Sequence, residues 1–180
     1  MAETKSRLTA EDLLRMPEDG RKYELIDGEL LVSPAGLRHE RIGVKIAFLL
    51  TAFVAPRDLG EVYGSSAGYK LPNGDLLSPD VSFVRRERLP GGKTPKGFGE
   101  FLPDLVVEIL SPGDNPREVL TKVGIYLSNG VPMLLLVDPD EETVAVYRSL
   151  TNVKVLRGDD VWSGEEVIPG FRCLVKHFFK

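Results

Sequence analysis

Two apolar runs separated by a helical pattern constrain the fold of this chain more than any other feature. The first run is residues 103–110, PDLVVEIL, and the second is residues 131–137, VPMLLLV. Strands with apolar residues at nearly every position are typical of the centre of a sheet that is covered on both faces. Between the runs, residues 117–128 have the apolar spacing of a helix, and a strand-like alternation follows at 143–148. This order predicts a βαββ core and an α/β fold.

The first residues of the chain predict a short helix and a hairpin. Thr9 precedes two acidic residues, which is typical of a helix N-terminus, and Pro17 is expected to end that helix. Residues 23–26 and 29–32 are β-prone, and the Asp27-Gly28 dipeptide between them suits a type I′ turn. We therefore expect an N-terminal hairpin added to the core.

A long helix and further strands are expected between the hairpin and the core. Residues 38–54 carry apolar side chains at helical spacing, and Pro56 is expected to end this helix. Residues 60–84 contain short β-prone stretches broken by glycine and proline, which predicts three or four strands of an antiparallel meander. The chain has no internal repeat and no linker-like segment, so we expect one domain over residues 1–180.

The composition is typical of a folded protein of the cytoplasm. Hydrophobic residues make up 42% of the chain and charged residues 28%, a balance that supports a packed core. Cys173 is the only cysteine, which excludes an intramolecular disulfide and predicts a cytoplasmic location. The charged amino-terminal run lacks the apolar core of a secretory signal, and no stretch approaches the roughly 20 apolar residues of a spanning helix. We therefore expect no membrane partner.

The charge of the chain argues against a protein that coats nucleic acid without selectivity, because the formal net charge is −4. A local basic surface is nevertheless present in residues 85–96, within an expected loop. It predicts a nucleic-acid contact, with a merely solvated loop as the alternative. His39, in phase with Ile42 and Ile46 on the long helix, is a further candidate as a base or phosphate contact; the alternative is a capping or surface histidine. The basic residues of the loop are Arg85, Arg86, Arg88, Lys93 and Lys96.

Glu108 is the most informative single residue, because it interrupts an apolar strand that we expect to be buried on both faces. A carboxylate in that position is costly unless a proton, an ionic partner or a bound cation neutralises it. Retained charges of this kind are enriched at functional sites. The alternatives are a structural ion pair or a carboxylate at the strand end that reaches water.

Asp80 brings a second carboxylate to the start of a second apolar strand, residues 81–84. Neighbouring strands lie about 4.8 Å apart, so carboxylates on one face of two such strands can share a hard cation such as Mg²⁺. The alternative for Asp80 alone is a turn after Pro79, in which its side chain bonds to the backbone.

Lys122 lies on the predicted helix that follows the Glu108 strand, three residues after Val119 and four before Tyr126. We expect both of those neighbours to face inward, so the ammonium can reach back toward the sheet. A lysine beside a carboxylate-bound metal can position water or offset charge in a phosphoryl transition state. The alternative is a lysine whose end extends to solvent.

These residues fall in motifs with a distinctive order. The chain reads SPDVSFV around Asp80, LPDLVVEILSP around Glu108, and KxxxY from Lys122 to Tyr126. VDP follows at 137–139, YELIDGEL opens the hairpin and IPGF comes near the end. Together the motifs resemble the putative restriction endonuclease family, a former domain of unknown function in the PD-(D/E)xK nuclease superfamily. The resemblance covers nearly the whole chain.

The resemblance implies a restriction-endonuclease-like mixed sheet flanked by helices, and it implies a site. Asp80 and Glu108 would bind Mg²⁺ or Mn²⁺ with the backbone carbonyl of Ile109, and Lys122 would be the catalytic lysine. Glu24 in the hairpin would be an auxiliary acid. The chain departs from the usual E-x-K motif, because Leu110 stands where that motif has lysine. Lys70, on a nearby predicted strand, is a second candidate for the lysine role.

Three functions remain open at this point. The first is a metal-dependent endonuclease that hydrolyses phosphodiester bonds in nucleic acid, with DNA as the expected substrate. The second is an inactive relative that binds nucleic acid or a protein partner, which Leu110 and the acidic net charge favour. The third is a glycosidase with paired carboxylates. Nucleases that cut both strands often act as homodimers, and the apolar tail at 175–179 is the contact surface that we expect for one.

Overall fold

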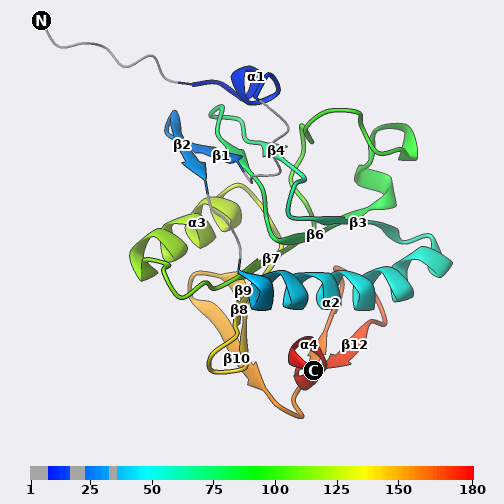
Figure 1. Cartoon of the computed structure of the whole chain (residues 1–180). Helices are drawn as coiled ribbons and strands as arrows, with labels where there is room; N and C mark the ends of the chain where they lie inside the picture. Colours follow the sequence, from blue (N-terminus) through cyan, green and yellow to red (C-terminus); the bar gives the residue numbers. More distant parts are fainter. Residues whose placement is uncertain (1–7, 17–22, 33–35) are drawn as a thin grey trace, which may run out of the picture.

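The computed structural model describes residues 8–16, 23–32 and 36–180. Its centre is a six-stranded sheet in which all neighbouring strands are antiparallel except one parallel pair, β7 and β8 (Figure 1). No helix in these ranges is long and apolar enough to cross a membrane. In spatial order the strands are β10 (Asn152–Arg157), β9 (Thr143–Ser149), β8 (Met133–Asp138), β7 (Leu105–Ile109), β6 (Val81–Arg85) and β3 (Gly60–Gly64).

The predicted βαββ core is confirmed as β7, helix α3 (Pro116–Ser128), β8 and β9. Helix α3 makes the crossover that parallel strands require, since a tight turn cannot join them. Its N-terminus is capped by Asn115, whose side chain accepts a hydrogen bond from the N–H of Arg117.

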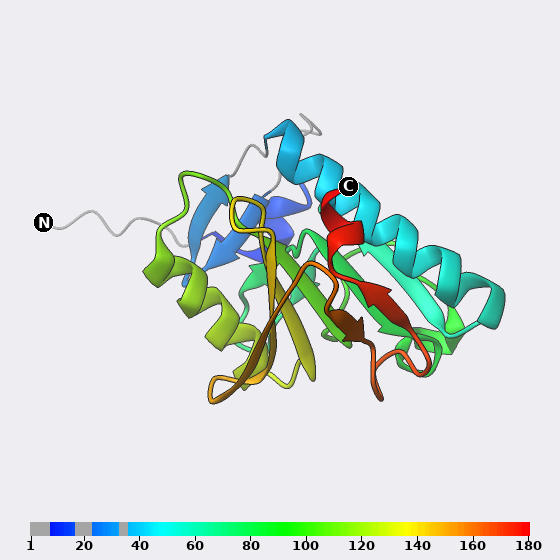
Figure 2. The same ribbon diagram turned by 90° about the horizontal axis from the view of Figure 1, so that it is seen from below.

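The two long helices cover opposite faces of the sheet (Figure 2). Helix α2 (Leu37–Val54) buries Ile42, Ile46 and Leu50 on the face that carries Val107. Helix α3 buries Val123 and Tyr126 on the face that carries Val106 and Leu134. Alternate residues of β7 therefore face different helices, as strand geometry requires. Helix α2 ends at Val54, before Pro56 as expected, and a 3₁₀ turn follows at Ala55–Arg57.

The hairpin is confirmed, with strands β1 (Tyr23–Ile26) and β2 (Glu29–Val32) joined by a turn with φ of 52° at Asp27 and 78° at Gly28. Positive φ at both turn positions is the signature of type I′. The short helix is α1 (Ala10–Leu13), capped by Thr9; Pro17 lies outside the described residues.

The antiparallel meander expected at residues 60–84 is wrong in its pairing, although four strands form there. Strands β3 and β6 pair with each other in the large sheet. Between them, β4 (Tyr69–Lys70) and β5 (Leu76–Leu77) form a small hairpin that joins a second sheet in the order β2-β1-β5-β4. The physical reason is that Leu76 pairs with Leu25 of β1. This pairing places the small hairpin in the sheet of β1, apart from its sequence neighbours β3 and β6.

The apolar tail is also placed differently from our expectation. Strands β11 (Val161–Ser163) and β12 (Arg172–Leu174) form a two-stranded sheet, and helix α4 (Lys176–Phe179) follows. Phe178 is 1% exposed and packs against Trp162 in the core on the α2 side. The apolar side chains of the tail are therefore part of the interior, and they do not offer the dimer surface predicted from its composition.

Candidate active site

Asp80 and Glu108 lie at the same edge of two neighbouring strands. Val81 pairs with Val107, so the next step of the antiparallel register places Asp80 opposite Glu108. Residues opposite each other in this way point to the same face of the sheet. The carboxylate of Asp80 is buried, and its Oδ2 accepts a hydrogen bond of 2.8 Å from the backbone N–H of Ile109.

Lys122 bridges two acids from distant parts of the chain. Its Nζ lies 2.8 Å from Oε1 of Glu24 and 3.0 Å from Oε2 of Glu108. Glu24 is buried on β1 and is held by a further hydrogen bond of 2.8 Å from the backbone N–H of Ser78. Four parts of the chain therefore meet at Lys122: strand β1, strand β7, helix α3 and the segment that precedes β6.

The surroundings of Lys122 keep it protonated. Burial by itself would lower the pKa of its ammonium, but the carboxylates of Glu108, Glu24 and Asp80 outweigh burial and raise that pKa above the ordinary lysine value. Because Asp80 contributes to this shift, all three acids act on the same ammonium. Lys122 is a cation at neutral pH.

Tyr126 is a contact of Glu108 that the sequence interpretation did not assign to the site. Its hydroxyl donates a hydrogen bond of 3.0 Å to Oε1 of Glu108, and the residue is fully buried. Burial raises the pKa of the phenol well above its usual value, and the charge of Glu108 adds to the effect. The signal was present in KxxxY, since residues four apart share one face of a helix.

His39 lies in the site, so its interpretation as a capping or surface residue is wrong. Its Nε2 is 3.1 Å from Oδ2 of Asp80, and its side chain is only 11% exposed. The first turn of α2 positions it there, next to Glu40. Asp80 therefore receives contacts from the start of α2 and from the end of β7.

Glu24, Asp80 and Glu108 form an acid cluster around Lys122, and the oxygen atoms of this cluster suit a hard divalent cation. Three carboxylates against one ammonium give a net charge of −2 when His39 is neutral. In a strand the N–H and C=O of one residue point to the same neighbour, so the carbonyl of Ile109 faces the side of Asp80. Within the described ranges no three His, Cys, Asp or Glu side chains form a metal-binding group. Two carboxylates, one carbonyl and water nevertheless match the way proteins hold Mg²⁺.

Lys70, the second candidate for the lysine role, lies elsewhere. Its Nζ is 2.8 Å from Glu11 of helix α1, and its side chain is 34% exposed. The acids that act on its pKa are Glu11 and Glu100, and the exposed ion pair with Glu11 raises that pKa. The structure thus brings Lys122, and not Lys70, to Glu108.

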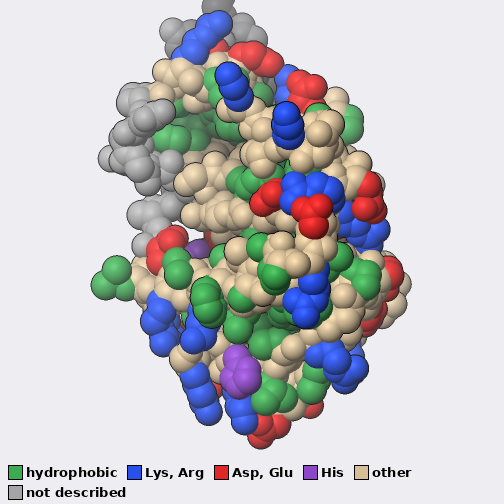
Figure 3. All heavy atoms as spheres, turned by 90° about the vertical axis from the view of Figure 1, so that its right-hand side faces the viewer, with side chains coloured by type: hydrophobic (Ala, Val, Ile, Leu, Met, Phe, Trp, Pro, Cys, Tyr) green, Lys and Arg blue, Asp and Glu red, His purple; other side chains and the backbone are tan. Residues whose placement is uncertain are grey.

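The structure does not bring the basic loop to Asp80. Strand β6 begins after Asp80 and ends at Arg85, so the loop lies at the opposite end of that strand. Arg86 lies within 3.0 Å of both Asp58 and Glu61, while Arg88 is 3.0 Å from Asp104. On the face shown in Figure 3, Lys and Arg side chains are interspersed with Asp and Glu.

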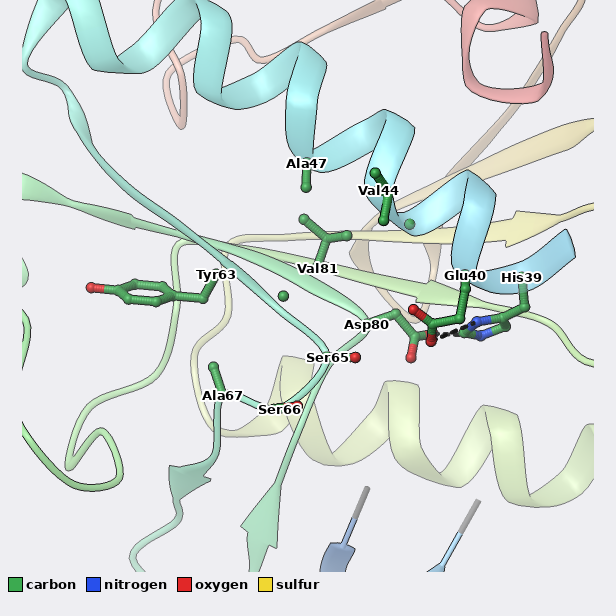
Figure 4. Close-up of a pocket in the computed structure, with 12 residues that line it drawn as sticks. His39, Glu40, Val44, Ala47, Tyr63, Ser65, Ser66, Ala67, Asp80 and Val81 are labelled. Atoms are coloured by element: carbon green, nitrogen blue, oxygen red, sulfur yellow. Dashed lines mark ion pairs between the residues drawn. The ribbon is translucent and has the colours of Figure 1, made fainter. Parts of the chain in front are cut away.

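A pocket of about 390 Å³ opens beside the acid cluster. Helix α2 forms one wall, residues 63–67 form another, and Val81 lies between them. Figure 4 shows His39, Glu40 and Asp80 grouped at one end of the pocket, while the ring of Tyr63 points away from them at the other end. The pocket is therefore continuous with the residues that hold Asp80.

Comparison with known proteins identifies the family. A family model described as Uma2, putative restriction endonuclease, matches residues 10–176. The chain belongs to the Uma2 family. The matched span includes every member of the acid cluster, so the resemblance seen in the motifs is confirmed.

A solved structure supports the fold of this Uma2 chain. It is described as a putative nuclease belonging to DUF820 from Anabaena variabilis ATCC 29413. The TM-score is 0.81 at 24% sequence identity, and the likeness covers 96% of this chain and 97% of that one. The restriction-endonuclease-like fold expected from the sequence is thereby confirmed. None of the curated proteins matches the chain.

Proposed function

We propose that the chain is a metal-dependent endonuclease that hydrolyses phosphodiester bonds in DNA. The observation that carries the proposal is the contact of the Lys122 ammonium with Glu108, 3.0 Å apart. Asp80 lies opposite Glu108 at the same edge of the sheet. The contact of Lys122 supplies from helix α3 the lysine that the chain lacks at Leu110. It also weakens the case for an inactive relative, which rested largely on that substitution.

The residues of the cluster divide the work by their chemistry. Asp80, Glu108 and the carbonyl of Ile109 would hold Mg²⁺ or Mn²⁺, which supplies an activated water and stabilises charge on the phosphate. The ammonium of Lys122 offsets negative charge that builds on the phosphoryl oxygens during attack. His39 orients the carboxylate of Asp80.

Glu24 and Tyr126 hold the other groups in place. Glu24 holds the ammonium of Lys122 beside Glu108 through contacts of 2.8 and 3.0 Å. Tyr126 holds one oxygen of Glu108 and leaves the second oxygen toward Lys122. Both act on residues that would touch metal or substrate.

Plasmid cleavage with Mn²⁺ tests the proposal. We expect the wild type to nick or linearise the DNA, and we expect Asp80→Asn, Glu108→Gln and Lys122→Met each to cut at least about 100-fold more slowly, the usual effect of losing one electrostatic catalytic group. Lys70→Met is the matched control, since that lysine pairs with Glu11 away from the cluster. Equal cutting by all five proteins would remove these side chains from catalysis.

Calorimetry separates the nuclease from the inactive relative that remains the second hypothesis. We expect Mn²⁺ to bind the wild type and to lose most of its affinity in Asp80→Asn. An inactive relative would bind DNA, leave it intact and show no Mn²⁺ binding that depends on Asp80. A parallel assay on RNA of the same sequence tests the choice of DNA.

A further inference from the structure

The pocket beside Asp80 has walls suited to a flat apolar group. Gly43 and Ala47, one helical turn apart on α2, form one side, and residues 64–67, GSSA, form the other. Such small side chains leave a slot between helix and loop. Val44 lies at its mouth and is 67% exposed, although it is apolar. Ligand pockets are lined mainly by apolar side chains, with a few polar groups that fix orientation.

The polar groups of the pocket suit the edge of a nucleobase better than a phosphate. Ser65 and Ser66 line the slot, and their hydroxyls can both donate and accept hydrogen bonds. The carboxylate of Glu40 repels anions but accepts hydrogen bonds from exocyclic amino groups of bases. An anionic group is therefore directed out of the slot, toward Asp80 and the cation proposed there.

We propose that this pocket binds one unpaired nucleobase of the nucleotide next to the cleaved phosphate. The inference rests on the proposed function, because the phosphate is placed at Asp80 and one of its two flanking nucleotides then lies at the mouth of the slot. The slot has a volume of about 390 Å³ and lies between one helix and one loop, so a base can enter it only after it has left the stack of a duplex. The substrate class is therefore nucleic acid with an unpaired nucleotide at the cut, such as single strands, flaps and junctions.

A filled pocket provides the test. Ala47→Phe places a ring in the slot, and Ala52→Phe places the same ring on an exposed turn of the same helix, outside the pocket. Binding of a labelled single-stranded DNA oligonucleotide is measured by fluorescence anisotropy with Mn²⁺ in the Lys122→Met background, which retains the carboxylates and slows cutting. The same titration on otherwise wild-type protein in EDTA covers the case in which that background folds poorly.

The expected result is single-strand binding about tenfold weaker in Ala47→Phe than in Ala52→Phe. Duplex of the same sequence should bind the parent protein more weakly than the single strand. An abasic strand of equal length should bind both variants alike, because it has no base to enter the slot. Equal single-strand affinities in the two variants, or a parent protein that prefers duplex or binds neither DNA, would overturn the inference.

The outcome is distinguishable from failure of the nuclease proposal. A wild type that binds single strands through the pocket but never cuts them with Mn²⁺ contradicts the nuclease and not the pocket. A wild type that cuts DNA, with Ala47→Phe as active on single strands as Ala52→Phe, contradicts the pocket and not the nuclease.

Discussion

Lys122 is a cation placed where a metal ion would also be attracted. Its ammonium contacts Glu24 and Glu108 at 2.8 and 3.0 Å, so it competes with any ion that binds Glu108. Glu24 provides a second contact, which can hold the ammonium when a metal ion binds Glu108. Removal of the charge of Lys122 and removal of the charge of Glu24 should therefore change the metal affinity in opposite directions.

We expect Lys122→Met to raise Mn²⁺ affinity and Glu24→Gln to lower it, each by about tenfold, which corresponds to about 1.4 kcal/mol. The first change removes the competing charge, and the second leaves the ammonium on Glu108 alone. Titration calorimetry measures both. Glu11→Gln serves as the control, because it removes an acid that pairs with Lys70 instead. Shifts of the same sign in the two cluster variants would contradict the competition.

The buried titratable groups predict a loss of stability at alkaline pH. Burial raises the pKa of Tyr126 and of Tyr69, and the neighbouring carboxylates raise that of Lys122 despite its burial. A group whose pKa is higher in the folded state stabilises the fold fully below its unfolded pKa, about 10 for tyrosine and 10.4 for lysine. That contribution is lost as the pH rises toward the folded pKa.

Urea unfolding between pH 7 and pH 11 checks this expectation. The free energy of unfolding should change little from these groups up to about pH 9 and fall above about pH 10. The fall should be shallower in Tyr69→Phe, because the buried hydroxyl that bonds to Ser82 is then absent. An unchanged alkaline slope in that variant would show that the phenol does not contribute.

Much of the cluster could be predicted from single residues, and the rest depended on contacts between distant segments. Glu108 and Asp80 stand out because each places a charge beside an apolar strand. The choice between Lys122 and Lys70 could not be made in this way, since it depends on which sheet the small β4–β5 hairpin joins. The contact of His39 with Asp80 depends on how α2 crosses the sheet edge, which local spacing does not encode.

At the scale of elements, helix α3 offers a matched pair of glycines. Gly124 lies inside the helix, and Gly130 lies just after its end with φ of 93°. A Cβ at either position meets nothing within 4 Å, so only the backbone conformation differs. We expect Gly124→Ala to stabilise the protein by about 0.5–1 kcal/mol and Gly130→Ala to destabilise it by about 1–2 kcal/mol. Chemical denaturation measures both, and equal effects would refute the backbone explanation.

Long elements were predictable and very short ones were not. The core strands and both long helices have enough apolar periodicity to define themselves, and the type I′ turn follows from Asp27-Gly28 alone. Strands β4 and β5 have two residues each, so their pairing is decided by partners such as Leu25 and not by their own sequence. The division of strands between two sheets is therefore a property of long-range contacts.

At the scale of the whole molecule, two phenylalanines test where the core ends. Phe178 in helix α4 is 1% exposed, whereas Phe48 in α2 is 65% exposed. We expect Phe178→Ala to cost about 3–5 kcal/mol of stability and Phe48→Ala to change it by less than about 0.5 kcal/mol.

Urea unfolding with light scattering in the same buffer checks the pair. One cooperative transition is expected, in agreement with the single domain predicted for residues 1–180. An unchanged oligomeric state in Phe178→Ala is also expected, since this ring faces the interior. A separate early transition in Phe178→Ala would instead show that the C-terminal segment unfolds on its own.

The ammonium of Lys122, which joins the hairpin to helix α3, also allows folding to precede metal binding. A newly made chain can bring its acid cluster together around this ammonium, so folding does not require a bound metal ion. Zinc fingers show the opposite arrangement, because they remain unfolded until their ion arrives. Under the proposed metal dependence, a cell short of divalent ions would hold this protein folded but inactive, and activity would return when ions bind.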